Sequence, residues 1–201
     1  MVKAICFNLD GVYFTEAGKK AFHKALVDIT GDEDKVVHVL YKSDEMRNFV
    51  TGKMTEEDFW NYFRDYLGIE LSDSELRQLW IKGYEANPDV RKVVLETREK
   101  GYKACICSNN NPARVAALQE RFKFLDDFDV VVFSYKVGNH KPSKEIFEAL
   151  VKEAGCEANE LAYADDNPER IQGAQDLGIN TFIYESFEQF VDELKKLGVN
   201  I

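Results

Sequence analysis

Seven polar residues follow apolar runs of this sequence and carry groups that could do chemistry together. They stand at the ends of four such runs: Asn8 and Asp10, Ser108 and Asn109, Lys141, and Asp165 with Asp166. Carboxylates brought into one site repel each other and raise one another's pKa unless a cation joins them. Oxygen ligands suit Mg²⁺, and a lysine with a hydroxyl can bind a phosphate. These residue types therefore favour phosphoryl transfer, provided that the fold gathers them.

Five short apolar runs have the composition of strands buried on both faces of a sheet. They span residues 2–8, 103–108, 129–134, 160–165 and 179–184. Helical patterns separate the later runs, and this alternation predicts an α/β fold. We expect a Rossmann-like, three-layer arrangement in which a parallel sheet carries helices on both faces. The carboxyl ends of its strands would then bring the polar residues to one edge.

Proline stands close behind three of these runs and marks places where helices are expected to begin. Asn111-Pro112, Lys141-Pro142 and Asn167-Pro168 each have proline where a first helical residue is expected, and the two asparagines are expected N-caps. We therefore expect three helix N-termini at the same edge of the sheet. Helix N-termini favour anions, which suits a phosphate ligand.

Residues 15–86 interrupt the alternation, because they contain helical patterns and no strand run. Thr55 is an expected N-cap, and Ser72 with Glu75 is an expected capping box. The aromatic residues of the segment fall partly at helical spacings and are expected to form mainly its own core. The predicted division is a Rossmann-like catalytic core and an all-helical cap: residues 1–14 and 87–201 for the core, and 15–86 for the cap.

The chain is acidic, with a formal net charge of −10. An average field of this sign repels polyanions, which argues against a nucleic-acid partner and against an anionic membrane. No apolar run approaches the roughly 18 residues that a membrane span requires, and no cleavable leader is apparent. We therefore expect a cytoplasmic protein whose partner is a small molecule. The sequence does not indicate the oligomeric state.

Four segments resemble, in order, the motifs of the haloacid dehalogenase (HAD) superfamily of hydrolases. They are FNLDGVYF (7–14), ACICSNNN (104–111), GNHKPSKEIF (138–147) and LAYADDNPERIQGAQDLG (161–178). The helical insert is similar to the small cap of the C1 phosphatase-like branch of that superfamily. The resemblance covers the whole chain. It implies a Mg²⁺-dependent phosphomonoesterase that acts on a small phosphorylated metabolite through an aspartyl-phosphate.

The resemblance also implies the metal ligands and the groups that do the chemistry. In the family, the residue at position 8 is an aspartate that attacks phosphorus and binds Mg²⁺ through its other oxygen. Asp10 matches the general acid and base, whose backbone carbonyl also binds the metal. Asp166 matches a direct metal ligand, and Asp165 matches one that acts through a bound water.

Three further residues match the phosphate-binding groups of the family. Ser108 matches the residue whose hydroxyl holds the phosphate, and Asn109 is a further phosphate contact. Lys141 matches the lysine that neutralises both the nucleophile and the phosphate, so it counts among the catalytic residues as well.

Asn8 departs from the family pattern, because an amide lacks the charge and basicity of a nucleophilic carboxylate. Its carbonyl oxygen can still bind a metal, so we expect binding to survive while chemistry is impaired. Asn8 is either an engineered substitution in an active phosphatase or a native residue of a non-catalytic phospho-ligand-binding pseudoenzyme. Asp10 favours the enzyme lineage, since proton transfer is its use. Haloacid dehalogenation is less favoured, because that branch is metal-independent and has little need for three aspartates.

Overall fold

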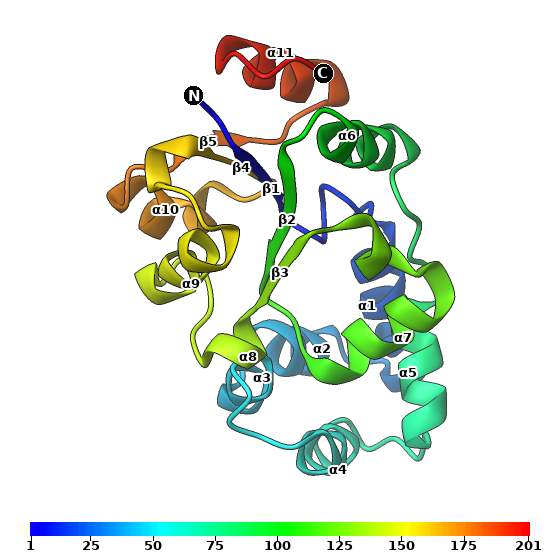
Figure 1. Cartoon of the computed structure of the whole chain (residues 1–201). Helices are drawn as coiled ribbons and strands as arrows, with labels where there is room; N and C mark the ends of the chain where they lie inside the picture. The colour runs from blue at the N-terminus through cyan, green and yellow to red at the C-terminus, as the bar shows by residue number, and fades with distance from the viewer.

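The computed structural model describes all 201 residues and contains one five-stranded parallel sheet (Figure 1). The strand order is β3-β2-β1-β4-β5. The strands are β1 (Ala4–Phe7), β2 (Lys103–Ser108), β3 (Val130–Phe133), β4 (Leu161–Asp165) and β5 (Asn180–Ile183). Each strand lies within the run that the sequence predicted. β1 sits at the centre, where Ile5 pairs with Ala104 of β2 and Ala162 of β4.

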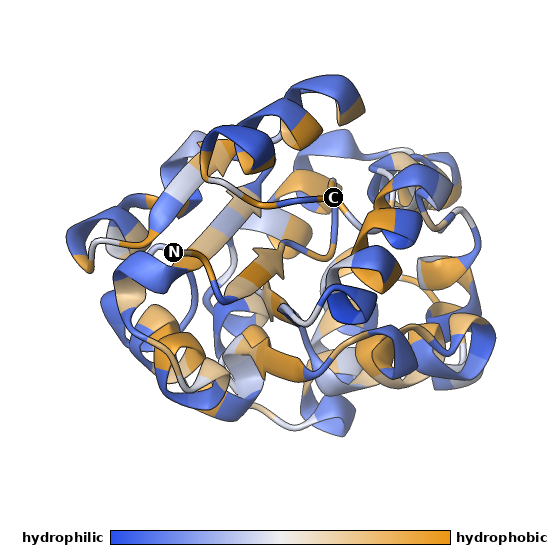
Figure 2. Cartoon of the chain, turned by 45° about the horizontal axis from the view of Figure 1, so that its top comes forward, coloured by the Kyte–Doolittle hydropathy of each residue, from blue (hydrophilic) through white to orange (hydrophobic).

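Helices cover both faces of the sheet and complete the three predicted layers. One face is covered by α6 (Pro88–Glu99), α7 (Pro112–Phe122) and α11 (Phe187–Lys196), the other by α9 (Lys144–Ala154) and α10 (Gln172–Asp176). Successive strand residues point to opposite faces, so Ile5 and Phe7 join the first core whereas Ala4 and Cys6 join the second. Figure 2 shows the hydrophobic colour gathered on the strands and on the inner sides of the helices. The short elements of the core are η2 (Phe124–Asp127), α8 (Ser134–Val137), η3 (Ala158–Glu160) and η4 (Pro168–Arg170).

The segment between β1 and α6 is helical and packs around a hydrophobic core of its own. Its elements are α1 (Ala17–Thr30), α2 (Glu33–Val37), the π-helix η1 (His38–Lys42), α3 (Asp44–Val50), α4 (Glu56–Leu67) and α5 (Asp73–Ile81). Phe59, Trp60, Phe63 and Trp80 are buried together in this core, whereas Tyr84 joins the core of the sheet. A helical cap is therefore present, and we keep residues 15–86 as its proposed extent. No helix in the chain combines the length and apolarity needed to cross a membrane.

Side-chain caps set the helix boundaries within this segment. The Thr55 hydroxyl accepts the Asp58 N–H at 3.1 Å, and Ser72 and Glu75 cap each other's backbone N–H groups, as the sequence predicted. Ser43 adds a boundary that the sequence pattern did not indicate, because its hydroxyl caps α3 and separates it from η1.

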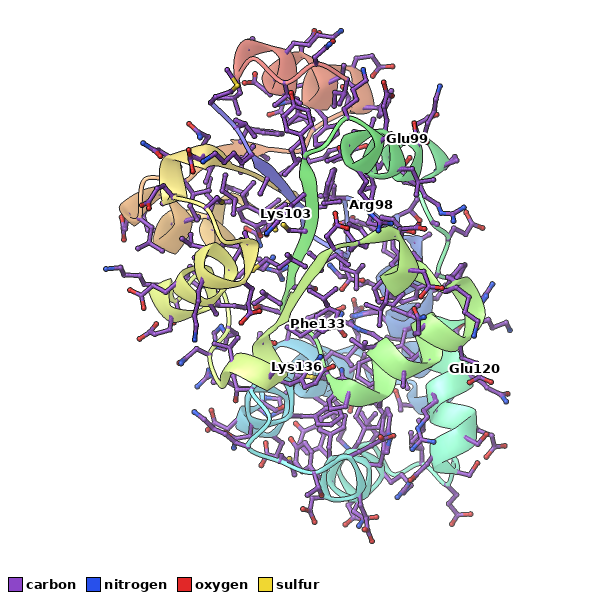
Figure 3. The ribbon with its side chains drawn as sticks, viewed as in Figure 1. Arg98, Glu99, Lys103, Glu120, Phe133 and Lys136 are labelled. Carbon is purple, nitrogen blue, oxygen red and sulfur yellow. The ribbon has the colours of Figure 1, made fainter.

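The cap contacts the core at the carboxyl end of β3, near the labelled Phe133 and Lys136 in Figure 3. There the Ser134 hydroxyl accepts the N–H of Asn110 at 2.9 Å and donates to the carbonyl of Val50, at the end of α3, at 2.6 Å. One hydroxyl thus joins the ends of two strands to the cap. Phe14 forms a second junction through bridges to Asp10 and Ala86.

One of the three predicted helix starts is wrong. Asn111 and Asn167 cap α7 and the 3₁₀ turn η4, each with proline at the start. Pro142 does not begin a helix, because α9 starts at Lys144. The physical reason is the Asn109 amide, which accepts the Lys141 N–H at 2.7 Å and donates to the Lys141 carbonyl at 3.1 Å. These two bonds hold the backbone of Lys141 in a loop conformation beside β2.

Gly173 of α10 packs directly against that loop, since a Cβ there would overlap the carbonyl oxygen of Pro142. In an open helix, Gly→Ala stabilises by about 1 kcal/mol. We expect Gly173→Ala instead to lower the free energy of unfolding by about 1–3 kcal/mol, as overpacking does. Urea denaturation measures the change. Gln175→Ala, at an exposed position of the same helix, is the control and should be near neutral. A stabilised Gly173→Ala protein would contradict the packing described.

Candidate active site

The carboxyl ends of the strands bring the predicted site residues together. Asn8 follows β1, Ser108 ends β2, and Asp165 ends β4. The Lys141 ammonium lies 2.9 Å from Asn8 Oδ1 and 2.5 Å from Asp165 Oδ2, and Asn8 Nδ2 lies 2.7 Å from Asp166 Oδ1. Groups separated by more than 130 residues therefore share one buried cluster, which is what the predicted topology requires.

The Lys141 ammonium is completely buried and has four oxygen partners. Besides Asn8 and Asp165, it donates to the Cys107 carbonyl at 3.1 Å and to the Tyr163 hydroxyl at 2.7 Å. Burial pushes the pKa of Asp165 up, but the ammonium outweighs it and holds that pKa below its ordinary value. Asp165 therefore stays ionised, and the pair forms a fixed charge contact at the floor of the site.

Tyr163 is a site residue that the sequence reasoning missed. Its hydroxyl accepts from Lys141 and donates to Asp165 Oδ2, so it fixes the geometry between them. Strand periodicity could have found it, because residues two apart on β4 point to the same face.

The Asn8 amide has an orientation that satisfies both of its ends. Its oxygen accepts from Lys141 and from the Leu9 N–H, both at 2.9 Å. Its Nδ2 donates to the Asp10 carbonyl and to Asp166 Oδ1, both at 2.7 Å, and lies 3.4 Å from Asp165 Oδ1. Three oxygens from two strand ends therefore converge on the amide nitrogen.

This oxygen set has the chemistry of a hard-cation site. A backbone carbonyl and two carboxylates are ligands that Mg²⁺ accepts, with water completing its shell. Burial raises the pKa of Asp166 above its ordinary value, and a cation beside this carboxylate would oppose that rise. No group of three or more acidic, histidine or cysteine side chains is arranged to hold a metal by itself. The oxygens around the Asn8 amide include the backbone carbonyl of Asp10. The residues fit Mg²⁺, and the Asn8 NH₂ group stands where they converge.

Gly11 allows this convergence. Its φ of 88° lies in the left-handed region, and a Cβ there would overlap the carboxylate of Asp166. A glycine at position 11 therefore allows the turn after β1 to pack directly against the carboxylate of Asp166.

Asp10 presents one paired and one free carboxylate oxygen. Oδ2 accepts from Arg114 Nη2 at 3.0 Å, whereas Oδ1 is buried and has no hydrogen-bond partner. Burial raises the pKa of Asp10, but Arg114, helped by Lys19 and Arg170, outweighs it and brings that pKa below the ordinary value. A buried oxygen without a partner at the rim of the cluster is suited to exchange a proton with a bound ligand.

Arg114 is a second residue that the sequence reasoning missed. It lies in the first turn of α7, where its guanidinium also donates to Asn110 Oδ1 at 2.8 Å and stands 5.6 Å from the Trp80 ring of the cap. Its place three residues after the N-cap Asn111, at the predicted ligand edge, was the available signal.

Ser108 and Asn109 lie at the predicted strand end, but their side chains differ in the hydrogen bonds that they make. The Ser108 hydroxyl makes no side-chain hydrogen bond and remains available to a ligand. The Asn109 amide is used by the backbone of Lys141, so its contacts favour a positioning role over direct phosphate binding.

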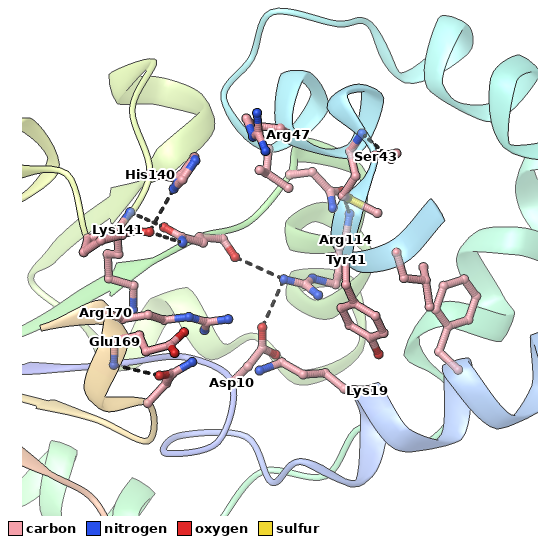
Figure 4. A pocket seen from close by; sticks show the side chains of 18 of the residues that line it. Asp10, Lys19, Tyr41, Ser43, Arg47, Arg114, His140, Lys141, Glu169 and Arg170 are labelled. Carbon is pink, nitrogen blue, oxygen red and sulfur yellow. Dashed lines mark hydrogen bonds and ion pairs between the residues drawn. The ribbon is translucent and has the colours of Figure 1, made fainter. Parts of the chain in front are cut away.

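A cavity of about 490 Å³ opens above this cluster, between cap and core (Figure 4). The core contributes Asp10, Asn109 and Lys141, and the cap contributes an apolar wall that includes Phe22 and Trp80. A volume of this size suits a small metabolite. Of the predicted site residues, Asp10, Asn109 and Lys141 line the cavity, so the cavity adjoins the polar cluster while the cap covers the rest.

Comparison with known proteins agrees with this geometry. A family model described as "haloacid dehalogenase-like hydrolase" matches residues 2–178. A D-ribitol-5-phosphate phosphatase from Bacteroides thetaiotaomicron is 29% identical over 202 residues, covering 96% of this chain and 97% of that protein.

Solved structures give the same result for the fold. A HAD family enzyme from the same organism, in complex with magnesium and inorganic phosphate, superposes with a TM-score of 0.81 at 24% identity, covering 94% of this chain and 99% of that one. The L-2-haloacid dehalogenase of Xanthobacter autotrophicus gives a TM-score of 0.65 at 21% identity, covering 98% of this chain and 83% of that one. At these identities the likeness concerns the fold alone.

Replacing Lys141 should destabilise the protein strongly. Lys141→Met removes the ammonium and leaves the Asp165 carboxylate buried without its counter-charge, so we expect a loss of about 3–5 kcal/mol in the free energy of unfolding. Urea denaturation near neutral pH measures it. Lys144→Met is the matched control, because Lys144 forms a weak surface pair with Glu148, at 3.5 Å, in which both side chains are exposed. This variant should change the free energy of unfolding by less than about 0.5 kcal/mol. Equal losses in the two variants would refute the buried pair.

Proposed function

The chain belongs to the haloacid dehalogenase-like hydrolases, and from this membership we propose that it has the site of a Mg²⁺-dependent phosphomonoesterase for a small phosphorylated metabolite. The observation that carries the proposal is the convergence of oxygens from Asp10, Asp165 and Asp166 beside the buried Lys141 ammonium. Oxygens suited to a cation thus lie beside an ammonium suited to an anion, and this arrangement supports phosphoryl transfer. The ribitol-phosphate phosphatase supports the substrate class, since it is similar over nearly its whole length.

Each residue has a separate task in this proposal. Asp166, the Asp10 carbonyl and the residue at position 8 would hold Mg²⁺, with Asp165 acting through water. When bound, the metal supplies positive charge to the phosphate oxygens. Lys141 neutralises the group at position 8 and the phosphate, and the free Ser108 hydroxyl donates to a phosphate oxygen.

With aspartate at position 8, the reaction balances in two steps. A carboxylate oxygen forms a bond to phosphorus while the bond from phosphorus to the leaving oxygen breaks, and Asp10 gives that oxygen a proton. Water then forms a bond to the phosphorus of the aspartyl-phosphate while the bond from phosphorus to the aspartate oxygen breaks, and Asp10 takes a proton from the water. This step releases phosphate and restores the carboxylate at position 8. Asn8 interrupts the first step, because its neutral amide oxygen is a weak nucleophile.

A second candidate function follows from the contacts of Asn8. Its amide is hydrogen-bonded at both ends within the cluster, so the side chain at position 8 is satisfied as it stands. This favours a protein that binds a phosphorylated ligand without turnover. Dehalogenation has less support, since the likeness to the dehalogenase lies in the fold and the oxygen cluster favours a metal-assisted reaction.

Restoring the carboxylate tests the phosphatase proposal. We expect Asn8→Asp with Mg²⁺ to release phosphate from an aryl phosphate or from a panel of metabolite phosphates at least ~10³-fold faster than the chain as written, because it regains the nucleophile. The double variant Asn8→Asp with Asp10→Asn should release phosphate about 10²-fold more slowly than Asn8→Asp alone, because it lacks the proton-transfer group. A phosphate-release assay measures all three proteins. Absence of any release from the Asn8→Asp protein would eliminate the phosphatase and leave the binding protein.

The same substitution should change how stability depends on the metal. Asn8→Asp replaces a hydrogen-bond donor by a third carboxylate beside those of Asp165 and Asp166. In metal-free buffer we therefore expect the free energy of unfolding to fall by about 1–3 kcal/mol and the melting temperature to fall by several degrees. Millimolar Mg²⁺ should recover the loss and stabilise Asn8→Asp more than the chain as written.

Thermal denaturation with and without Mg²⁺ measures this difference. Asn159→Asp adds the same charge at an exposed position and should show no such dependence on Mg²⁺. If Mg²⁺ stabilised the chain as written and the Asn8→Asp variant equally, the result would argue against a cation at the point where the oxygens converge.

A further inference from the structure

The cavity between cap and core has a charge opposite to that of the whole chain. The chain carries a net −10, yet five cationic residues line the cavity against two acidic ones. The cations are Lys19, Arg47, Arg114, Lys141 and Arg170, and the acids are Asp10 and Glu169. Positive charge concentrated in a cleft of an acidic protein attracts anions to that cleft. The transferred phosphate would account for only part of this charge.

Three of the five cations already have an acidic partner. Arg47 pairs with Asp44 at 3.0 Å, Arg114 pairs with Asp10 at 3.0 Å, and Lys141 pairs with Asp165. Those charges are largely balanced within the chain. Arg114 and Lys141 also hold the carboxylates of the cluster in place, so they are not free to bind a distant part of a ligand.

Lys19 and Arg170 differ, because neither makes a side-chain hydrogen bond or an ion pair. Both are half-buried. Lys19 comes from α1 of the cap, and Arg170 comes from η4, directly after β4 of the core. Figure 4 shows both charged ends pointing into the cavity, from its two sides. Glu169 is exposed and forms no pair with Arg170.

Two like charges facing one cavity repel each other, and partial burial strengthens that repulsion. An anion between them would remove it and accept charge-assisted hydrogen bonds from both sides. The planar guanidinium of Arg170 can hold a carboxylate or a phosphate through two N–H groups. Phe22, Leu40 and Trp80 bound the rest of the space, which suits a short carbon chain between two anionic ends.

We propose that Lys19 and Arg170 form a second anion subsite, so that the preferred ligand is a small phosphomonoester whose leaving group carries a carboxylate or a second phosphate. The inference rests on the proposed function, because the transferred phosphate is taken to occupy the cluster at Lys141. It goes further by assigning the substrate a second negative group. Binding that group from both cap and core also favours the closed arrangement of the two.

Calorimetry on the chain as written, in Mg²⁺, tests the subsite without requiring turnover. Glycerol 3-phosphate and 3-phosphoglycerate form a matched pair, since a CH₂OH group in one is a carboxylate in the other. Glycerol 1,3-bisphosphate provides the arm with a second phosphate, and inorganic phosphate probes the cluster alone. We expect 3-phosphoglycerate, the bisphosphate or both to bind about tenfold or more tightly than glycerol 3-phosphate. The two arms identify which anion the subsite prefers.

Substitutions then assign the preference to residues. Lys19→Gln and Arg170→Gln should each bring the ratio of the paired affinities close to one, whereas Arg170→Lys should retain part of it. Lys20→Gln is the control, because Lys20 is exposed, pairs with Glu16 and does not line the cavity; it should leave the ratio unchanged.

Several results would overturn the proposal. The first is equal affinity for the two matched ligands together with no higher affinity for the bisphosphate. The second is the absence of binding by any of the ligands. The third is an affinity ratio that stays unchanged in both glutamine variants. If Lys19→Gln and Arg170→Gln lowered the affinity for inorganic phosphate as much as the affinity for both monoesters, the two residues would instead bind the transferred phosphate. Failure of Asn8→Asp to release phosphate rejects the proposed function separately, because the affinity ratio is measured without chemistry.

Discussion

The site depends on one buried ammonium. Lys141 reaches the floor of the cluster from a loop and there contacts groups on β1, β2 and β4. A lone charge in that position would be costly, so the strand ends must present oxygens to it, and they do so through a carbonyl, a hydroxyl, an amide and a carboxylate. The arrangement that neutralises Lys141 also fixes Asp165 and Asn8. Positions suited to a cation and a phosphate therefore follow from satisfying a single buried charge.

Much of this was predictable, because strands and their ends follow from local patterns. The runs around Cys6 and Cys107 are apolar apart from Lys3 and Lys103 near their starts, and parallel topology brings Asn8, Ser108 and Asp165 to one edge. Lys141-Pro142 was misjudged, because proline is equally suited to a loop and the decisive bonds come from Asn109, thirty-two residues away. Local propensity contains no information about such a distant partner.

The residues that were missed share a physical cause. Arg114, Lys19 and Arg170 are ordinary charged residues of amphipathic helices or turns, and their meaning depends on which charges stand opposite them. Arg114 gains its role by pairing with Asp10, whereas Lys19 and Arg170 gain theirs by forming no ion pair. The first condition is set by the packing of α7 against the end of β1, and the second by the placement of the cap over the sheet. The periodicity of the individual segments specifies neither arrangement.

The guanidinium of Arg114 lies between two bodies of the molecule. The Trp80 ring on one side belongs to the cap, whereas Asp10 and Asn110 on the other belong to the core. A hinge motion that lifted the indole away would expose the arginine to water and weaken its hold on the aspartate. In the proposed reaction Asp10 is the proton-transfer group, so its environment would change with the opening of the cap through this one aromatic contact.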